Sequence, residues 1–154
     1  MNYKIVEKES LTIVGISVRT TNQNGQAMKD IGELWNRFIK ENIKDKITNK
    51  IDDEVYSVYT DYEGDFTKPY TVIIGCKVPH TNNIPNNMQS KIIPNSTYAV
   101  FTAKGKIPEA IIDTWQTIWH EAIKRSYTND FELYDDRSKN MEHAEVDIYI
   151  AINQ

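Results

Sequence analysis

The 154-residue sequence lacks several features that would assign it to a common class of protein. Cys76 is its single cysteine, so no disulfide forms within the chain, and its strand-like neighbours favour a packed thiol over a reactive one. No segment approaches the roughly 18 to 20 apolar residues of a membrane helix. The start, MNYKIVEKES, has no basic end followed by an apolar run. We therefore expect a cytoplasmic protein with no membrane partner.

Sequence motifs for metals, nucleotides and serine nucleophiles are missing as well. The six glycines are scattered, so there is neither GxGxxG nor a P-loop, and no GxSxG elbow occurs. His80, His120 and His143 form neither HxxxH nor HExxH. The sequence thus predicts no metal site and no cofactor.

The charge balance disfavours nucleic acid as a direct partner. The chain carries 18 basic and 22 acidic residues, a formal net charge of -4. Phosphate binding needs lysines and arginines gathered on one face. The densest basic stretch, residues 40–50, is interrupted by Glu41 and Asp45 and is typical of a solvated helix end and loop.

Apolar residues at three- and four-residue spacing predict two helices, each with one buried face. The first is expected at about Ala27–Asn42. The second begins near Pro108, whose fixed φ suits a first turn, and extends to about Ile123. The stripes are Met28, Ile31, Leu34, Trp35, Phe38 and Ile39, then Ile111, Ile112, Trp115, Ile118, Trp119, Ala122 and Ile123.

Segments rich in β-branched and aromatic residues predict the strands. Six are clear in the sequence: LTIVGISVRT, EVYSVYTDY, YTVIIGCKV, STYAVFTAKG, DFELYDD and EVDIYIAI. Shorter extended pieces are expected at residues 3–8 and 88–93.

The order strand, helix, strand, strand occurs twice, which indicates a duplication. We predict one α+β domain over residues 1–154, made of two βαββ repeats related by pseudo-twofold symmetry, at about 1–80 and 88–154. Trp35 is matched with Trp119, and Tyr59 with Tyr134. We expect an antiparallel sheet with both helices on one face and a ligand groove on the other.

Strand alternation assigns side chains to these two faces. Phe131 and Leu133 are expected to pack under the helices, which leaves Glu132 on the far face. The far face then gathers the rings of Tyr59, Tyr134 and Tyr149 around Glu132. A carboxylate among rings is poorly solvated, which raises its pKa, and a bound cation would restore its charge and gain cation–π attraction. The alternative is that Glu132 is an ordinary strand residue facing water.

The chain resembles the GyrI-like family, the small-molecule-binding domain found alone or fused to DNA-binding domains in AraC- and MerR-type multidrug regulators. The resemblance spans nearly the whole chain. It is carried by IGELWNRF, VYSVYTDYE, YTVIIGCKV, STYAVFTAKG, IWHEAIKRSY, DFELYDD and EVDIYIAI, in that order. One departure is Ala151, which stands where IYIPI-like ends commonly have proline.

The resemblance implies a stand-alone effector-binding domain whose pocket is centred on the glutamate of the Phe-Glu-x-Tyr strand, here Glu132. The family's pocket aromatics carry over to Tyr59, Tyr98, Trp115, Trp119 and Tyr149. The tryptophans also lie on apolar helical stripes, so core packing is an alternative for them. No helix-turn-helix is recognised, so we expect no direct nucleic-acid binding.

Three functions stay open at this point. The first is binding of hydrophobic, aromatic or cationic small molecules, as in drug or toxin sensing or sequestration. Because some stand-alone members resemble hydrolases of cyclopropane-bearing genotoxins, the second is an enzyme that uses Glu132 to direct water. The third is a protein-interaction module that contacts a partner such as gyrase.

Overall fold

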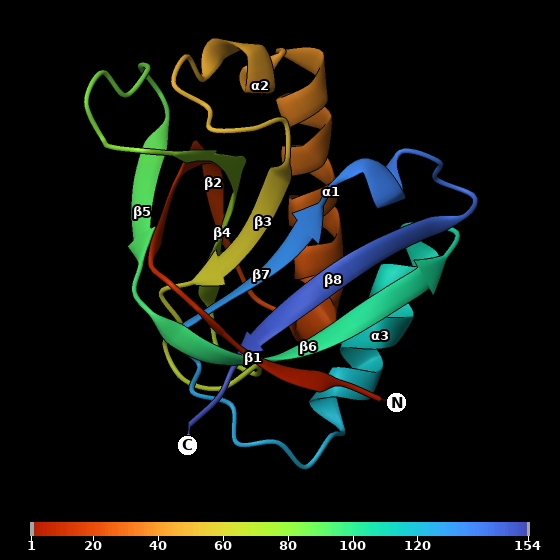
Figure 1. Ribbon diagram of the computed structural model, residues 1–154. Helices are drawn as coiled ribbons and strands as arrows, with labels where there is room; N and C mark the ends of the chain where they lie inside the picture. The colour runs from red at the N-terminus through yellow and green to blue at the C-terminus, as the bar shows by residue number, and fades with distance from the viewer. Residues whose placement is uncertain (1, 154) are drawn as a thin grey trace.

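The computed structural model describes residues 2–153 and has the expected α+β architecture. Its strands are β1 (Lys4–Lys8), β2 (Leu11–Thr20), β3 (Val55–Thr60), β4 (Tyr70–Val78), β5 (Gln89–Ile93), β6 (Ser96–Gly105), β7 (Asn129–Tyr134) and β8 (Ala144–Ala151). The helices are α1 (Gln26–Lys40), α2 (Ile43–Lys46) and α3 (Glu109–Trp119), with short 3₁₀ turns η1 (Gln23–Gly25) and η2 (Asp136–Ser138). Figure 1 shows α1 and α3 on the same side of the sheet.

The sheet has eight antiparallel strands in the order β1-β6-β8-β7-β3-β4-β2-β5. This order reads as two equivalent halves that meet at the β3–β7 pair, so the duplication is confirmed. Each half donates its first strand to the other: β1 pairs with β6, and β5 pairs with β2. At the centre, Ser57 of β3 lies opposite Glu132 of β7. The pseudo-twofold axis relates these two positions to each other. It therefore also relates Tyr59 to Tyr134, each of which lies two residues further along its own strand.

Helix α1 forms because its apolar residues recur on one side, and Leu34 and Phe38 bury that side against the sheet. Arg37 and Lys40 in its last turn complement the helix dipole. Asn42 then adopts a left-handed φ of 50°, which ends the helix and begins the short α2.

Helix α3 is shorter than the sequence pattern indicated. It ends at Trp119, and Ala122 and Ile123 lie in the loop that follows. That loop is tied to the C-terminal end of β8, since Ser126 N–H donates to the Ala151 carbonyl at 2.9 Å and Asn153 N–H to the Lys124 carbonyl at 2.8 Å. Tertiary hydrogen bonds therefore override the local helical period.

Both faces of the sheet are packed, and this corrects one expectation. Phe131 and Leu133 do not lie under the helices; they belong to a core on the opposite face, together with Tyr56, Val58 and Tyr98. The helix side holds two separate cores, one under α1 and one under α3. The alternation of side chains along β7 was predicted correctly, but the two faces were assigned the wrong way round.

The β2–β4 pair contains one point where two backbones touch. Gly15 lies opposite Gly75, and a Cβ atom on Gly15 would come within 2.0 Å of the Ile74 carbonyl oxygen.

We expect Gly15→Ala to lower the free energy of unfolding by about 3 kcal/mol, the upper end of overpacking costs, as measured by urea denaturation. Gly32→Ala, at an open position inside α1, is the matched control and should stabilise by about 0.5–1 kcal/mol. Equal stability of the two variants would contradict this close approach.

Candidate functional site

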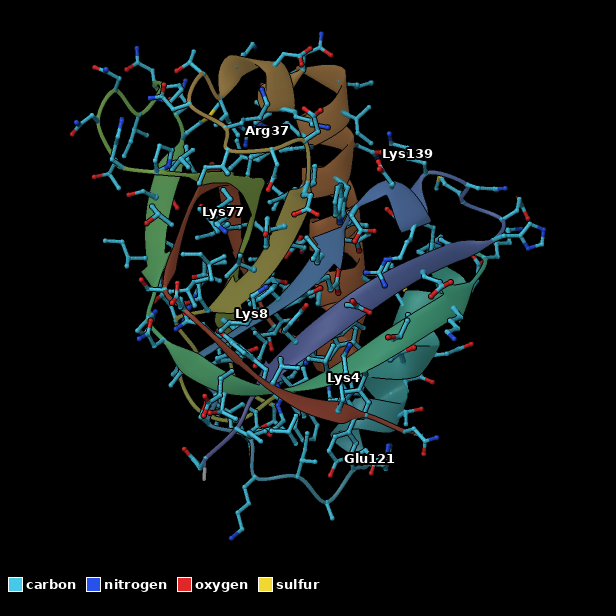
Figure 2. The ribbon with its side chains drawn as sticks, viewed as in Figure 1. Lys4, Lys8, Arg37, Lys77, Glu121 and Lys139 are labelled. Atoms are coloured by element: carbon cyan, nitrogen blue, oxygen red, sulfur yellow. The ribbon has the colours of Figure 1, made fainter. Side chains whose placement is uncertain are left out.

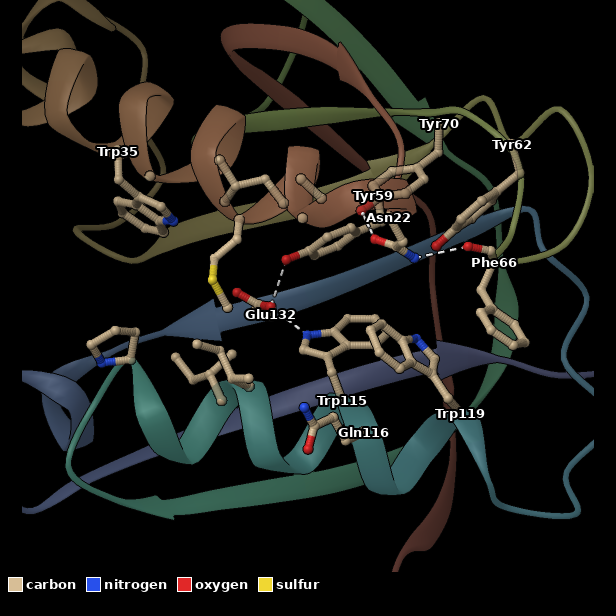
Figure 3. A pocket seen from close by; sticks show the side chains of 18 of the residues that line it. Asn22, Trp35, Tyr59, Tyr62, Phe66, Tyr70, Trp115, Gln116, Trp119 and Glu132 are labelled. Carbon is tan, nitrogen blue, oxygen red and sulfur yellow. Dashed lines mark hydrogen bonds between the residues drawn. The ribbon is translucent and has the colours of Figure 1, made fainter.

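A cavity of about 360 Å³ lies between α1, α3 and the helix-facing side of the sheet. Its lining is largely apolar and rich in aromatic rings, and it includes Trp35, Tyr59, Trp115, Trp119, Glu132 and Tyr134. Figure 3 shows Trp115 and Trp119 extending from α3 toward Tyr59 and Glu132. The groove expected on the far face is therefore wrong: the cavity is on the same face as the helices, in the gap between them.

Glu132 lies at the floor of this cavity and is almost fully buried, with 2% of its surface exposed. Three side chains donate hydrogen bonds to its carboxylate. Tyr59 Oη and Trp115 Nε1 each donate to Oε2 at 2.7 Å, and Tyr134 Oη donates to Oε1 at 2.5 Å. The donors come from β3, α3 and β7, so the carboxylate joins both halves of the duplication.

Burial raises the pKa of Glu132, and its three hydrogen bonds oppose that shift because they favour the charged form. The pKa values of Tyr59 and Tyr134 are also raised by burial and by the neighbouring carboxylate, so both phenols stay protonated and act as donors. Within residues 2–153 no lysine or arginine forms an ion pair with Glu132. The charge of the ionised carboxylate is thus uncompensated.

The rings beside Glu132 follow the pseudo-twofold symmetry. Trp35 of α1 packs edge-on against Tyr134 at 4.8 Å between ring centroids, and Trp115 of α3 packs against Tyr59 at 4.9 Å. Each helix thus places a tryptophan on the tyrosine of the opposite half. This geometry makes Trp115 the counterpart of Trp35, so the match between Trp35 and Trp119 is wrong.

Trp119 instead helps to form one end of the cavity. Its ring stacks on Phe66, with centroids 5.7 Å apart and an interplanar angle of 11°. The loop that carries Phe66 is held in place because Asn22 Nδ2 donates to the Phe66 carbonyl at 2.8 Å, while Tyr70 Oη donates to Asn22. Figure 3 shows this group at the opposite end of the cavity from Trp35.

Five of the seven residues predicted as ligand-binding line this cavity: Glu132, Tyr59, Tyr134, Trp115 and Trp119. Tyr98 and Tyr149 do not. They lie on the opposite face, where the Tyr149 ring stacks on Phe131 at 4.5 Å and Tyr98 meets the same phenylalanine edge-on. The register explains this placement, because Tyr149 is paired with Phe131 across β7 and β8 and cross-strand partners share a face.

Several residues that line the cavity were not predicted from the sequence as ligand-binding. Tyr62, Phe66 and Arg125 come from loops, where no hydrophobic period exists to assign a direction. Tyr70 is the one missed tyrosine with an available signal, since alternation along β4 sets it on the same side as Val72 and Ile74. Trp35 was predicted to lie on the buried stripe of the first helix and to mark the repeat, but it was not predicted as a ligand-binding residue.

Other kinds of site receive no support from the described part of the chain. Among residues 2–153 no group of three histidine, cysteine or acidic side chains could hold a metal ion. No helix in that range is long and apolar enough to cross a membrane. Cys76 is buried in β4, and burial raises its pKa to about 11, as expected for a packed thiol.

Comparison with known proteins shows that the chain is an α+β effector-binding domain of the GyrI-like type, as the sequence resemblance implied. Residues 4–152 match the Cass2 family, described as integron-associated effector binding proteins, and the chain belongs to that family.

Two curated relatives extend this comparison. YobU of Bacillus subtilis (strain 168) is 30% identical over 91% of this chain and 91% of its own. The transcriptional regulator BrlR of Pseudomonas aeruginosa is 33% identical over 99% of this chain, which spans only 56% of BrlR. The family is therefore associated with transcription regulators.

Among solved structures, that of SAV2435 bound to tetraphenylphosphonium superposes with a TM-score of 0.82. It covers 99% of this chain and 94% of its own, at 22% sequence identity. At that level of identity the likeness establishes the shared fold.

The raised pKa of Glu132 predicts how stability changes with pH. The folded state binds its proton more tightly than the unfolded state, whose carboxyl titrates near 4.5. This contribution to stability is complete below that pH and is lost as the pH rises through the folded pKa. The loss amounts to about 1.4 kcal/mol for each unit by which the pKa is raised.

We therefore expect the stability of wild type relative to Glu132→Gln to fall as the pH rises from about 4. Urea denaturation at a series of pH values measures the difference. Glu7→Gln, at an exposed position in β1, controls for the removal of one charge. A wild-type advantage that grows with pH would contradict the sign of the shift.

Proposed function

We propose that this domain binds hydrophobic monocations, with flat or aromatic substituents, in the cavity between α1 and α3, and that Glu132 is their counter-charge. The observation that carries the proposal is a buried carboxylate on the floor of a cavity rich in aromatic rings, with no basic partner in the described part of the chain. Its biological role would be that of an effector site, where the bound compound is sensed or sequestered.

The energetics favour a single positive charge. An ionised carboxylate out of water is costly, and an entering cation offsets that cost. The faces of Trp35, Tyr59 and Trp115 add cation–π attraction. Among the described residues that line the cavity, Glu132 is the only acidic one, and nearby Asp130 is already paired with Arg125, so a second positive charge would find no carboxylate there.

The hydrogen bonds of Glu132 indicate which kind of cation fits. Its two oxygens already accept from Tyr59, Trp115 and Tyr134. A ligand therefore needs no N–H group of its own, so quaternary and charge-delocalised cations suit the site. Tetraphenylphosphonium, which occupies SAV2435, is a cation of this kind, and this supports the proposal.

Binding of tetraphenylphosphonium to wild type and Glu132→Gln tests the counter-charge. All three tryptophans line the cavity, so their fluorescence should be quenched on binding. We expect the dissociation constant to rise at least about tenfold in Glu132→Gln, which corresponds to about 1.4 kcal/mol, and to stay unchanged in Glu7→Gln.

Equal affinity of wild type and Glu132→Gln would overturn the proposal, as would the absence of saturable binding to wild type. The same samples are then assayed for conversion of the compound by mass spectrometry. Conversion that is lost in Glu132→Gln would replace the binding function with a hydrolase.

A further inference from the structure

A second polar centre lies beside the same cavity, formed by Arg125 in the loop between α3 and β7. The backbone of this loop is fixed to the end of β8 by a bridge between Arg125 and Ile152. The guanidinium is directed inward as a result: 6% of the Arg125 side chain is exposed, and the residue lines the cavity wall.

Arg125 is only partly satisfied in this position. Its Nη2 donates to Asp130 Oδ2 at 2.9 Å, whereas Nε and Nη1 are buried and have no partner among the described residues. Asp130, in contrast, also accepts from the backbone N–H of Ala151 and from the hydroxyl of Tyr62. Leaving a buried donor unpaired is unfavourable, so an acceptor that reached these groups would be favoured.

The surrounding rings hold the guanidinium plane in place. Its central carbon lies 4.3 Å from the centroid of Tyr127 and 5.9 Å from that of Trp115. Tyr127 takes a left-handed φ of 54°, which is rare for an aromatic residue and is found where surrounding structure or function requires it. Two aromatic rings thus lie beside the guanidinium, and two of its N–H groups have no partner among the described residues.

Trp115 sets the distance between the two polar centres. Its indole N–H contacts Glu132 while its ring lies against Arg125, so one indole separates the carboxylate from the guanidinium. Since Asp130 already neutralises Arg125, this second centre has unpaired donors but no net charge. It therefore suits a neutral acceptor better than an anion.

We propose that Arg125 is a specificity-determining residue that selects cations carrying a neutral carbonyl oxygen, such as an ester, ketone or amide, about one aromatic ring away from the positive centre. This inference rests on the proposed function, because Glu132 holds the cationic end. Because neighbouring atoms cover Nε and Nη1, the Arg125 side chain has to turn toward the cavity for the carbonyl oxygen to accept from them. A plain hydrocarbon tail leaves both N–H groups unpaired.

Two matched probes test the selection: heptyltriphenylphosphonium and (4-methoxycarbonylbutyl)triphenylphosphonium, whose tails are both seven atoms long, the ester tail carrying the carbonyl oxygen in addition. Their dissociation constants are measured with wild type and Arg125→Lys, which keeps the charge opposite Asp130. We expect the ratio of the ester constant to the heptyl constant to rise about tenfold in Arg125→Lys. Arg37→Lys, at an exposed position on α1, should leave the ratio unchanged.

A ratio that is the same in wild type and Arg125→Lys overturns the role of Arg125. If Arg125→Lys does not fold, the infrared band of a ¹³C-labelled ester carbonyl bound to wild type decides instead. A shift to lower wavenumber than in water-free solvent supports the hydrogen bond, and an unshifted band overturns it. If the heptyl compound binds in a Glu132-dependent way but the ester is not selected, the proposed function stands and only the role of Arg125 is overturned. If neither probe binds, both proposals are overturned.

Discussion

The buried carboxylate of Glu132 accepts hydrogen bonds from side chains of β3, β7 and α3, and the arrangement of the cavity depends on this contact. Without these donors, an ionised carboxyl at this depth would be too costly to retain. With them, the group still has no lysine or arginine as an ion-pair partner among residues 2–153. The site thus combines an unpaired carboxyl group with apolar walls, an arrangement that suits a hydrophobic cation.

The duplicated fold explains how one chain supplies such a site. The two halves meet at the β3–β7 pair, and each helix covers the outer part of its own half. The space between the helices is therefore left over the centre of the sheet, where the pseudo-twofold axis passes. Position 57 carries serine where its counterpart, position 132, carries glutamate, so a nearly symmetric frame holds a single charge.

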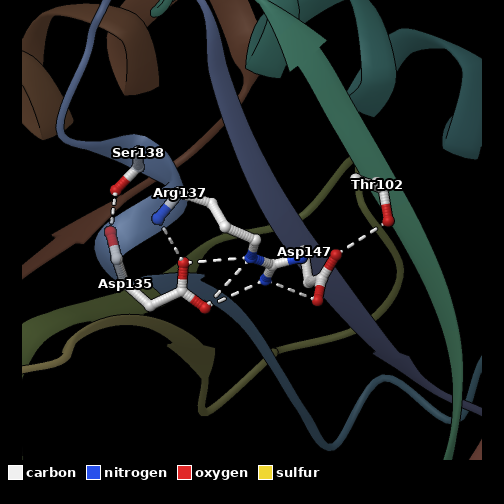
Figure 4. A network of polar contacts seen from close by, with 5 residues as sticks. All are labelled: Thr102, Asp135, Arg137, Ser138 and Asp147. Carbon is white, nitrogen blue, oxygen red and sulfur yellow. Dashed lines mark hydrogen bonds and ion pairs between the residues drawn. The ribbon is translucent and has the colours of Figure 1, made fainter.

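A separate polar network stabilises the opposite face. Arg137, in the turn that follows β7, contacts both Asp135 and Asp147, and Thr102 donates to Asp147 at 2.7 Å (Figure 4). Lys8 of the edge strand β1 lies 4.9 Å from the centroid of Tyr149 on the same face (labelled in Figure 2). Tyr98 and Tyr149 thus belong to a packed, charge-rimmed core, and their aromatic character serves stability.

Much of this structure could be predicted from the sequence, for identifiable reasons. Strands such as β2 and β4 match their sequence runs residue for residue, because β-branched runs bounded by polar turns leave little ambiguity. Alternation correctly placed Tyr59, Glu132 and Tyr134 on one face. Alternation alone cannot say which face the helices cover, so the cavity was expected on the wrong side. Arg125 could not be found, because its direction depends on a loop tied to β8.

The most direct test of the central claim is a crystal structure of the domain with tetraphenylphosphonium. We expect the phosphorus between α1 and α3, within about 6 Å of the Glu132 carboxylate, the range over which opposite charges and ring faces act strongly. A phosphorus on the other face of the sheet, beside Tyr98 and Tyr149, or at the protein surface away from Glu132, would contradict it.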